Sequence, residues 1–177
     1  IELDSEVVIR SAGLGEDVAG GKFVLSYSLY GADPRYTEGA IANVDLWKNL
    51  FTEWTMRVYY DDSVPADVLQ HLRVAKVELV DMTGSTLNKM VWRFLAGSDV
   101  SVAKFCSRDI DSRLSGREKS AIDAWLQSGK LFHVIRDHPS HSKFAMSGGL
   151  WCATHNAIPD ITTLLINSQI GHEYIDD

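Results

Sequence analysis

Short apolar runs alternate along this chain with longer amphipathic stretches. Residues 23–29 and 56–60 are rich in β-branched and aromatic side chains, and each run ends in polar or turn-forming residues. Such runs are typical of buried strands. Between them, residues 37–51 repeat their apolar positions at helical spacing, which predicts a helix with Thr37 as its N-cap. The ordered part of the chain is therefore expected to start with a strand, a helix and a second strand.

The same alternation continues toward the C-terminus. Ser63 is the expected cap of a helix that begins at Pro65. Further helices are predicted at residues 88–95, 118–128 and 161–166, and further strands at residues 77–80, 100–106, 132–135 and 150–153. Strands that alternate with helices predict an α/β fold with a mainly parallel sheet flanked by helices. We expect residues 1–21 to form a lead-in and residues 22–177 to form one domain.

Polar side chains follow the predicted strands. The carboxyl ends of parallel strands meet at one edge of a sheet, and ligands of such sheets bind beyond that edge. We therefore expect one shared site, to which the strand ends contribute Ser28, Asp61, Asp81, Arg108, Asp109, Arg136 and Asp137.

Charge and cysteine content narrow the classes of function. The net charge of −7 argues against general nucleic-acid binding, which requires a basic face. No apolar run approaches the roughly 18 residues of a membrane span, and no signal peptide is visible at the N-terminus. Cys106 and Cys152 form neither a disulfide framework nor a metal-binding CxxC motif. We expect Cys106 to be a small buried hydrophobic residue, although a single bridge to Cys152 remains an alternative.

Two carboxylates separated by one residue follow the apolar run 100–106. Asp109 and Asp111 point in similar directions if the backbone is extended, and they repel each other unless a cation lies beside them. Hard oxygen ligands of this kind suit Mg²⁺ or Mn²⁺, which retain waters and also bind phosphate oxygens. The alternative is an ordinary surface network in which the two acids pair with Arg108 and Arg113.

Four segments, the third of which contains this acidic motif, occur in a characteristic order. They comprise residues 28–31 with Tyr36, Thr37 and Asn43; residues 57–65; residues 92–94, 107–113 and 125–126; and residues 132–139 with 148–151. In this combination, the chain from about residue 23 to residue 151 resembles a family of small GT-A-type glycosyltransferases known from bacterial polysaccharide loci and large algal viruses.

This resemblance implies a GT-A fold, which is a Rossmann-like α/β domain with a mixed, mainly parallel sheet. It implies a metal-dependent transfer of a sugar from a nucleotide-diphosphate donor, expected to be a UDP-sugar, to a glycan or glycoprotein acceptor. Asp109 and Asp111 would hold Mn²⁺ or Mg²⁺. The donor would contact Ser28, Leu29, Tyr30, Asp81, Arg93 and Asp109, with Lys89 as a weaker candidate. For Arg93, a solvated charge on a helix surface is the alternative.

The catalytic base has two candidates. An inverting transferase needs a carboxylate to take the proton of the acceptor hydroxyl, and Asp137 and Asp177 are available. A retaining enzyme needs no such base, and the sequence leaves both mechanisms open. The family pattern continues past Asp177, so we expect part of the acceptor side to be missing. The cytoplasm is favoured by the resemblance, while an acidic domain also suits a secretory lumen.

Two other functions are alternatives. A non-catalytic carbohydrate- or nucleotide-binding module on the same fold is the main alternative, and the intact acid pair counts against it. An aspartyl-nucleophile phosphatase is disfavoured because it carries its acidic motif on the first strand.

The segment between residues 136 and 151 adds three local expectations. His138 and His141 lie in a polar loop that can bind sugar hydroxyls or simply make local hydrogen bonds. Gly148 and Gly149 are expected where the backbone closely approaches a ligand or a neighbouring strand. Trp151 is expected in the core rather than stacked on a sugar.

Overall fold

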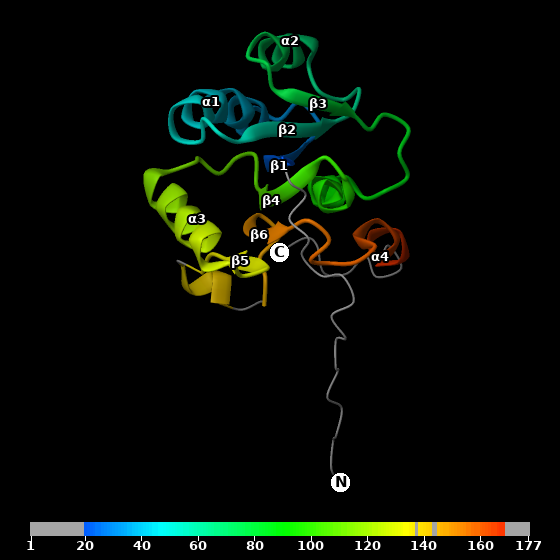
Figure 1. Ribbon diagram of the computed structural model, residues 1–177. Coiled ribbons are helices and arrows are strands. Elements are labelled where there is room, and N and C mark those ends of the chain that lie inside the picture. The colour runs from blue at the N-terminus through cyan, green and yellow to red at the C-terminus, as the bar shows by residue number, and fades with distance from the viewer. Residues whose placement is uncertain (1–19, 137, 143–144, 169–177) are drawn as a thin grey trace.

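The computed structural model describes residues 20–136, 138–142 and 145–168 (Figure 1). They form an α/β domain around one six-stranded sheet with the strand order β3-β2-β1-β4-β6-β5. The strands are β1 (Lys22–Leu29), β2 (Thr55–Tyr60), β3 (Glu78–Asp81), β4 (Val102–Arg108), β5 (Phe132–Val134) and β6 (Leu150–Thr154). Strands β3, β2, β1 and β4 run parallel, whereas β6 is antiparallel to both of its neighbours. The expected α/β class with a mixed sheet is confirmed.

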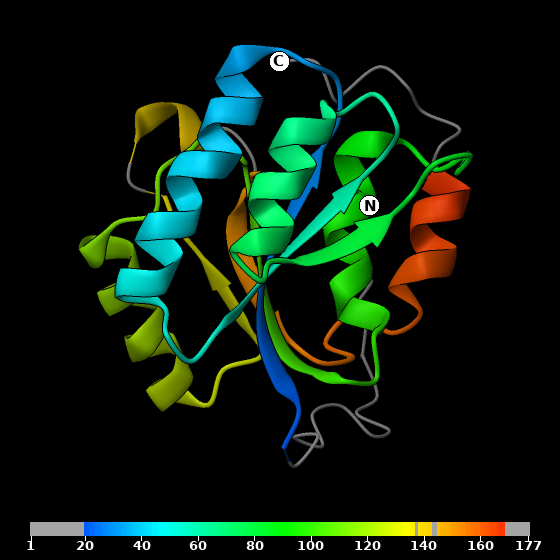
Figure 2. The same cartoon turned by 90° about the horizontal axis from the view of Figure 1, so that it is seen from above.

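Helices cover both faces of the sheet (Figure 2). One face carries α1 (Pro34–Leu50), α2 (Ala66–Val74) and α3 (Gly116–Ser128). The other face carries the 3₁₀ helix η1 (Lys89–Ser98) and α4 (Ile161–Ser168), while a short turn, η2 (Pro139–Ser142), follows β5. Within the described residues, none of the helices has the length and apolarity needed to cross a bilayer.

The first two helices begin differently from the prediction. Helix α1 begins at Pro34, and Asp33 is its N-cap because its side chain accepts a 2.8 Å hydrogen bond from the backbone N–H of Arg35. Thr37 lies within the first turn, so the predicted cap at Thr37 is wrong. Proline is favoured at the first helical position, where its missing N–H is not needed.

The predicted cap of α2 is also wrong. Pro65 occupies the N-cap position of α2 and makes no side-chain cap hydrogen bond. The hydroxyl of Ser63 instead accepts a 2.7 Å hydrogen bond from the backbone N–H of Gly31 and hydrogen-bonds the carboxylate of Asp61. Ser63 therefore joins the loops that follow β1 and β2, at the edge of the sheet where the site was expected.

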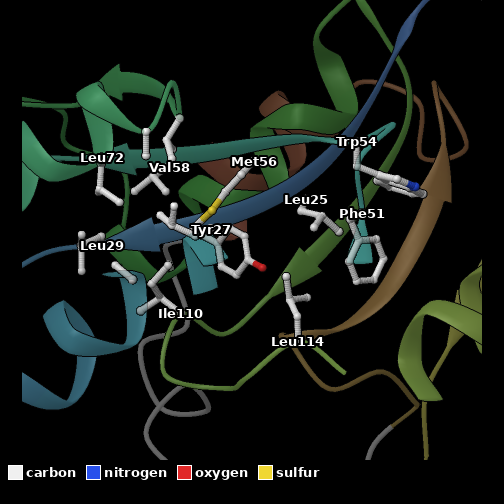
Figure 3. Close-up of a cluster of buried hydrophobic side chains, with 14 of the residues drawn as sticks. Leu25, Tyr27, Leu29, Phe51, Trp54, Met56, Val58, Leu72, Ile110 and Leu114 are labelled. Atoms are coloured by element: carbon white, nitrogen blue, oxygen red, sulfur yellow. The ribbon is translucent and has the colours of Figure 1, made fainter. Parts of the chain in front are cut away.

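Strand β1 is buried on both faces, as expected for a central parallel strand. Leu25, Tyr27 and Leu29 face the helices α1–α3 together with Met56 and other residues (Figure 3). The alternate side of β1 carries Ser26 and Ser28, which face η1. Full burial of one Leu or Met side chain contributes about 1.5–3 kcal/mol, so this layer fixes β1 at the centre of the sheet.

Helix η1 is anchored at its end by a buried arginine. Arg57 of β2 is 2% exposed. Its Nη1 atom lies 2.8 Å from Oδ2 of Asp99, and its Nη2 atom lies 2.9 Å from Oε1 of Glu78. Asp99 is the C-cap residue of η1 and Glu78 begins β3. The charge of Arg57 therefore joins η1 to the sheet.

A disulfide joins the antiparallel strands β4 and β6. Cys106 and Cys152 lie directly opposite each other in the register, and their Cα atoms are 3.9 Å apart. Both residues are buried. The expectation that Cys106 is an unbridged hydrophobic residue is therefore wrong, and the alternative of a single bridge is correct.

The path of the chain creates a crevice between β1 and β4. From β1 the chain crosses one face of the sheet through α1 to reach β2, and it returns to β4 across the other face through η1. The strand order therefore reverses between β1 and β4. In open α/β sheets, ligands bind at such a reversal, beyond the carboxyl ends of the strands.

Candidate functional site

A cavity of about 690 Å³ lies at this reversal. Its walls come from the end of β1, the first turn of α1, helix η1 and the loop after β4. The lining residues are Ser28, Leu29, Tyr30, Arg35, Tyr36, Met90, Arg93, Asp109, Ile110, Asp111 and Ser112. This set contains both predicted metal ligands and all the predicted donor contacts except Asp81 and the weaker candidate Lys89.

Asp81 lies away from this cavity. Asp81 is exposed at the end of β3, where its Oδ1 accepts a 2.9 Å hydrogen bond from the backbone N–H of Thr83. Hydrogen bonding by the side chain of Thr83, and then by its backbone N–H, lowers the pKa of the Asp81 carboxyl. The two candidate bases, Asp137 and Asp177, lie outside the described residues.

Arg93 binds the first acid of the motif. Its Nη1 atom lies 2.5 Å from Oδ1 of Asp109. Two serines of β1 hold the backbone of Arg93, because the hydroxyl of Ser26 donates to its carbonyl at 2.6 Å and its N–H donates to Oγ of Ser28 at 3.1 Å. Arg93 is only 8% exposed, so the alternative of a solvated helix charge is wrong. Ser28 positions Arg93 in addition to lining the cavity.

Arg35 binds the second acid. Its Nε and Nη2 atoms both lie 2.7 Å from Oδ2 of Asp111. The side chain of Arg35 is 70% exposed, whereas that of Asp111 is 18% exposed. The hydrogen bond to Asp111 and the charge of that residue raise the pKa of Arg35 above its ordinary value. Arg35 is not among the residues predicted from the sequence. Its place in the first turn after the β1 loop is nevertheless a signal, because that turn faces the strand ends.

The alternative pairing of the acids with Arg108 and Arg113 is wrong. Arg108 is buried, and its Nε lies 2.8 Å from Oε1 of Glu118 while its Nη1 donates to the carbonyl of Gly149 at 2.9 Å. Arg113 donates from Nη1 to the backbone carbonyl of Asp111 at 2.9 Å. The acids use arginines from α1 and η1 instead of those beside them in the sequence.

A buried asparagine holds the acidic loop in place. Nδ2 of Asn43 donates to the carbonyls of Ile110 and Ser112, both at 2.9 Å, and its Oδ1 accepts from the N–H of Leu114 at 3.1 Å. Ile110, between the two acids, is buried in the core. This leaves Asp109 and Asp111 lining the cavity on either side of an anchored residue.

The glycine pair lies against the same site. A Cβ atom at Gly149 would overlap the carboxylate of Asp109, and one at Gly148 would lie 2.7 Å from Nη2 of Arg93. The expected close approach is confirmed, and the approaching groups are the Asp109–Arg93 pair. Trp151 is 4% exposed and packs on Phe105, which confirms its expected place in the core.

The carboxyl end of β2 adds a second ion pair near the cavity. Nζ of Lys89 lies 2.5 Å from Oδ2 of Asp61, and it also lies 5.7 Å from the ring centroid of Tyr30. Burial acts to raise the pKa of Asp61, but the hydrogen bonds from Lys89 and Ser63 outweigh it, and the pKa falls below its ordinary value. Lys89 is therefore engaged by Asp61 rather than directed at the acidic motif.

The two acids suit a cation that arrives with its ligand. No cluster of three or more His, Cys, Asp or Glu side chains that could hold a metal occurs among the described residues. Mg²⁺ is usually held by one or two carboxylates, with waters and substrate phosphates completing the shell. Asp109 and Asp111 match this donor set, because both carboxylates line one cavity with room for a diphosphate. To hold such a cation, each carboxylate would have to release its arginine partner.

Comparison with protein-family models and with curated proteins found no match to this chain. The functional conclusion therefore depends on the geometry of the cavity and on the motifs that form it.

Proposed function

We propose that this chain is the donor-binding catalytic domain of a metal-dependent glycosyltransferase of the GT-A type. It transfers a sugar from a UDP-sugar to a glycan or glycoprotein acceptor. The observation that carries the proposal is the alternation of two carboxylates and two guanidinium groups around the cavity at the β1–β4 reversal.

A nucleotide diphosphate matches both halves of this charge pattern. Its phosphate oxygens accept hydrogen bonds from guanidinium groups, and arginine suits them because its donors form a planar fork. The carboxylates of Asp109 and Asp111 provide hard oxygen ligands for Mn²⁺ or Mg²⁺, and such an ion, when bound, neutralises charge on the leaving diphosphate. Neither the arginines nor the acids alone would provide both contacts.

The residues of this chain bind and orient the donor. Arg93 is fixed by Ser26 and Ser28, so its guanidinium is preorganised for a phosphate oxygen. Tyr30 lines the cavity at the end of β1, where a base or ribose can pack against its ring. Preorganised donors of this kind stabilise charge that develops on a leaving group without further rearrangement.

One observation favours a second function. Each acid already pairs with an arginine, so no metal is needed to offset its charge. A non-catalytic module could therefore bind a nucleotide through Arg35 and Arg93 alone. Such a module would bind the nucleotide diphosphate without any metal.

Calorimetric titration of UDP and a panel of UDP-sugars, first with Mn²⁺ and then with EDTA, distinguishes the two functions. We expect binding that requires Mn²⁺ and is lost in Asp111→Asn. Asp123→Asn is the matched control, because Asp123 is a carboxylate of α3 that pairs with Lys119 at 2.6 Å and does not line the cavity.

The outcomes separate clearly. Binding of equal strength in Mn²⁺ and in EDTA would favour the non-catalytic module. Binding by Asp111→Asn as tight as that of the Asp123→Asn control, with Mn²⁺ present, would refute the assignment of Asp111 to the metal. Sugar transfer to a glycan by the wild type, but not by Asp111→Asn, would establish the catalytic function.

A further inference from the structure

A buried carboxylate lies beside the cavity at the β1–β4 reversal without lining it. Asp61 directly follows β2 and is 5% exposed, and it is not among the residues that form the cavity wall. A buried charge costs free energy unless it is paired and hydrogen-bonded. Replacement of a buried ion pair by apolar side chains is often neutral for stability or even favourable. Stability alone therefore does not explain a carboxylate at this position.

One oxygen of this carboxylate holds the loop that follows β1. Oδ1 of Asp61 accepts hydrogen bonds from the hydroxyl of Ser63 and, at 3.1 Å, from the backbone N–H of Ser63. A hydroxyl has a single hydrogen to donate, so its oxygen is left to accept the N–H of Gly31 at 2.7 Å. These groups therefore form one directed chain of hydrogen bonds from Gly31 to Asp61.

Gly31 needs a contact of this kind. Its φ angle is +72°, in the left-handed region, and glycine adopts positive and negative φ angles about equally readily. The bond from its N–H to Ser63 therefore selects one conformation of the loop. Tyr30, the residue before Gly31, lines the cavity. The same bond consequently helps to determine where the ring of Tyr30 lies.

The other oxygen holds the start of η1. Oδ2 of Asp61 lies 2.5 Å from Nζ of Lys89, which is the first residue of η1. A cation at the N-terminus of a helix is unfavourable toward the helix dipole, so the helix itself does not favour Lys89 there. Nζ of Lys89 also lies 5.7 Å from the ring centroid of Tyr30, and the next residue, Met90, lines the cavity. The ion pair therefore joins the start of η1 to the loop that carries Tyr30.

We propose that Asp61 is a positioning residue for the part of the cavity that receives the nucleoside of the donor. It fixes Tyr30 through Ser63 and Met90 through Lys89, so it sets the two surfaces between which the nucleoside lies. The assignment to a nucleoside rests on the proposed transferase function.

The part of the cavity assigned to the diphosphate is held by other residues. The backbone of Arg93 is bonded to Ser26 and Ser28 of β1, and the acidic loop is bonded to Asn43 of α1. These anchors come from β1 and α1 rather than from the loop after β2. A change at Asp61 should therefore affect the nucleoside and leave the diphosphate site intact.

Calorimetric titrations of UDP and of inorganic pyrophosphate, both with Mn²⁺, test this division. Asp61→Asn loses the charge pair with Lys89, so we expect UDP to bind about tenfold more weakly and pyrophosphate to bind as it does to the wild type. Ser63→Ala breaks the chain to Gly31 and is expected to give the same pattern. Ser63→Thr keeps the hydroxyl and should retain the wild-type affinity for UDP.

Two further variants calibrate these titrations. Asp67→Asn makes the same change of charge at an exposed carboxylate of α2, so it is the matched control for Asp61→Asn and should bind both ligands like the wild type. Arg93→Ala should weaken both ligands, because its guanidinium contacts a phosphate in the proposed function. A variant that weakens UDP alone is thereby distinguished from a change of net charge and from a damaged phosphate site.

A second measurement needs no nucleotide. In NMR spectra of the ligand-free protein, Ser63→Ala should shift the amide signal of Gly31, and Lys89→Met should shift that of Met90. Asp61→Asn should shift both signals, because its carboxylate is common to the two links.

Each outcome decides the proposal. Equal losses of affinity for UDP and pyrophosphate in Asp61→Asn and Ser63→Ala overturn it, because the residues then act on the whole domain. Unchanged affinity for UDP in both variants also overturns it. If the wild type binds neither ligand, the transferase function is refuted. The expected amide shifts would then still support the role of Asp61 in fixing the two surfaces, and unchanged amide signals would overturn that role as well.

Discussion

Arg93 and Asp109 form an ion pair in the lining of the cavity at the β1–β4 reversal, with Nη1 and Oδ1 2.5 Å apart. The arginine is almost fully buried, and its backbone is bonded to Ser26 and Ser28, whereas the side chain of Asp109 is 43% exposed. The fixed member of the pair is therefore the cation. In the proposed function, an incoming phosphate would meet a guanidinium that is already in place, and Asp109 would be the partner that moves.

Replacement of Arg93 is expected to weaken donor binding. Arg93→Ala should reduce the affinity for UDP with Mn²⁺ by about 1–3 kcal/mol, the usual loss of a charge-assisted hydrogen bond. Arg93→Lys keeps the charge but loses the fork, so its affinity should lie between that of Arg93→Ala and that of the wild type. Calorimetry of the three proteins measures the order. An unchanged affinity in Arg93→Ala would remove this residue from the donor site.

Replacement of Arg35 is expected to have opposite effects on the metal and on the nucleotide. Arg35 competes with a cation for Asp111, so Arg35→Ala should bind Mn²⁺ alone several-fold more tightly than the wild type. It should bind UDP with Mn²⁺ less tightly, because one phosphate partner is lost. Electron paramagnetic resonance of free Mn²⁺ and calorimetry of UDP measure the two effects. A change of the same sign in both would contradict the exchange of partners.

An added methyl group at Gly149 is expected to disrupt the site without unfolding the domain. Gly149→Ala brings a Cβ atom into the carboxylate of Asp109, which must then rotate away from Arg93. Affinity for UDP with Mn²⁺ should fall at least tenfold while the circular dichroism spectrum stays the same. Gly116→Ala is the control, since a Cβ atom there meets nothing within 4 Å. Equal donor affinity in both variants would show that Asp109 is not needed in this position.

Removal of the Tyr27 hydroxyl is expected to stabilise the protein. The side chain is fully buried, and its hydroxyl has no hydrogen-bond partner in the described residues. Burial raises the pKa of Tyr27, so the group stays neutral. Tyr27→Phe should therefore raise the free energy of unfolding by about 1 kcal/mol, because an unsatisfied buried donor is removed.

Urea denaturation measures this change. Tyr36→Phe, at a residue that is 38% exposed, is the control and should leave the stability almost unchanged. A loss of stability in Tyr27→Phe would show that the hydroxyl makes a favourable interaction within the core.

Local patterns in the sequence determined most of the elements and the centre of the candidate site. Hydrophobic periodicity reports which side of an element is buried, so the strands and helices were predicted to within a few residues of their observed ends. Gly148 and Gly149 indicated a close approach because glycine has no Cβ, so another group can lie directly against its backbone. The predicted cap at Thr37 is wrong because the helix starts earlier in the chain. Asp33 is the N-cap, and Pro34 is favoured at the first helical position.

Only the tertiary structure decided which distant residues meet. Arg35 and Asp111 are 76 positions apart. The place of Arg35 after the β1 loop indicates that it faces the strand ends, but it does not indicate which acid Arg35 binds. The antiparallel direction of β6 places Cys152 opposite Cys106 and so determines the disulfide. A second cavity, of about 330 Å³, forms where α3, the residue that follows β5 and the start of β6 meet the acidic loop. The local sequence determines which side of each element is buried. These contacts instead depend on how whole faces of helices and sheet pack against each other, and a short stretch of sequence carries no information about that packing.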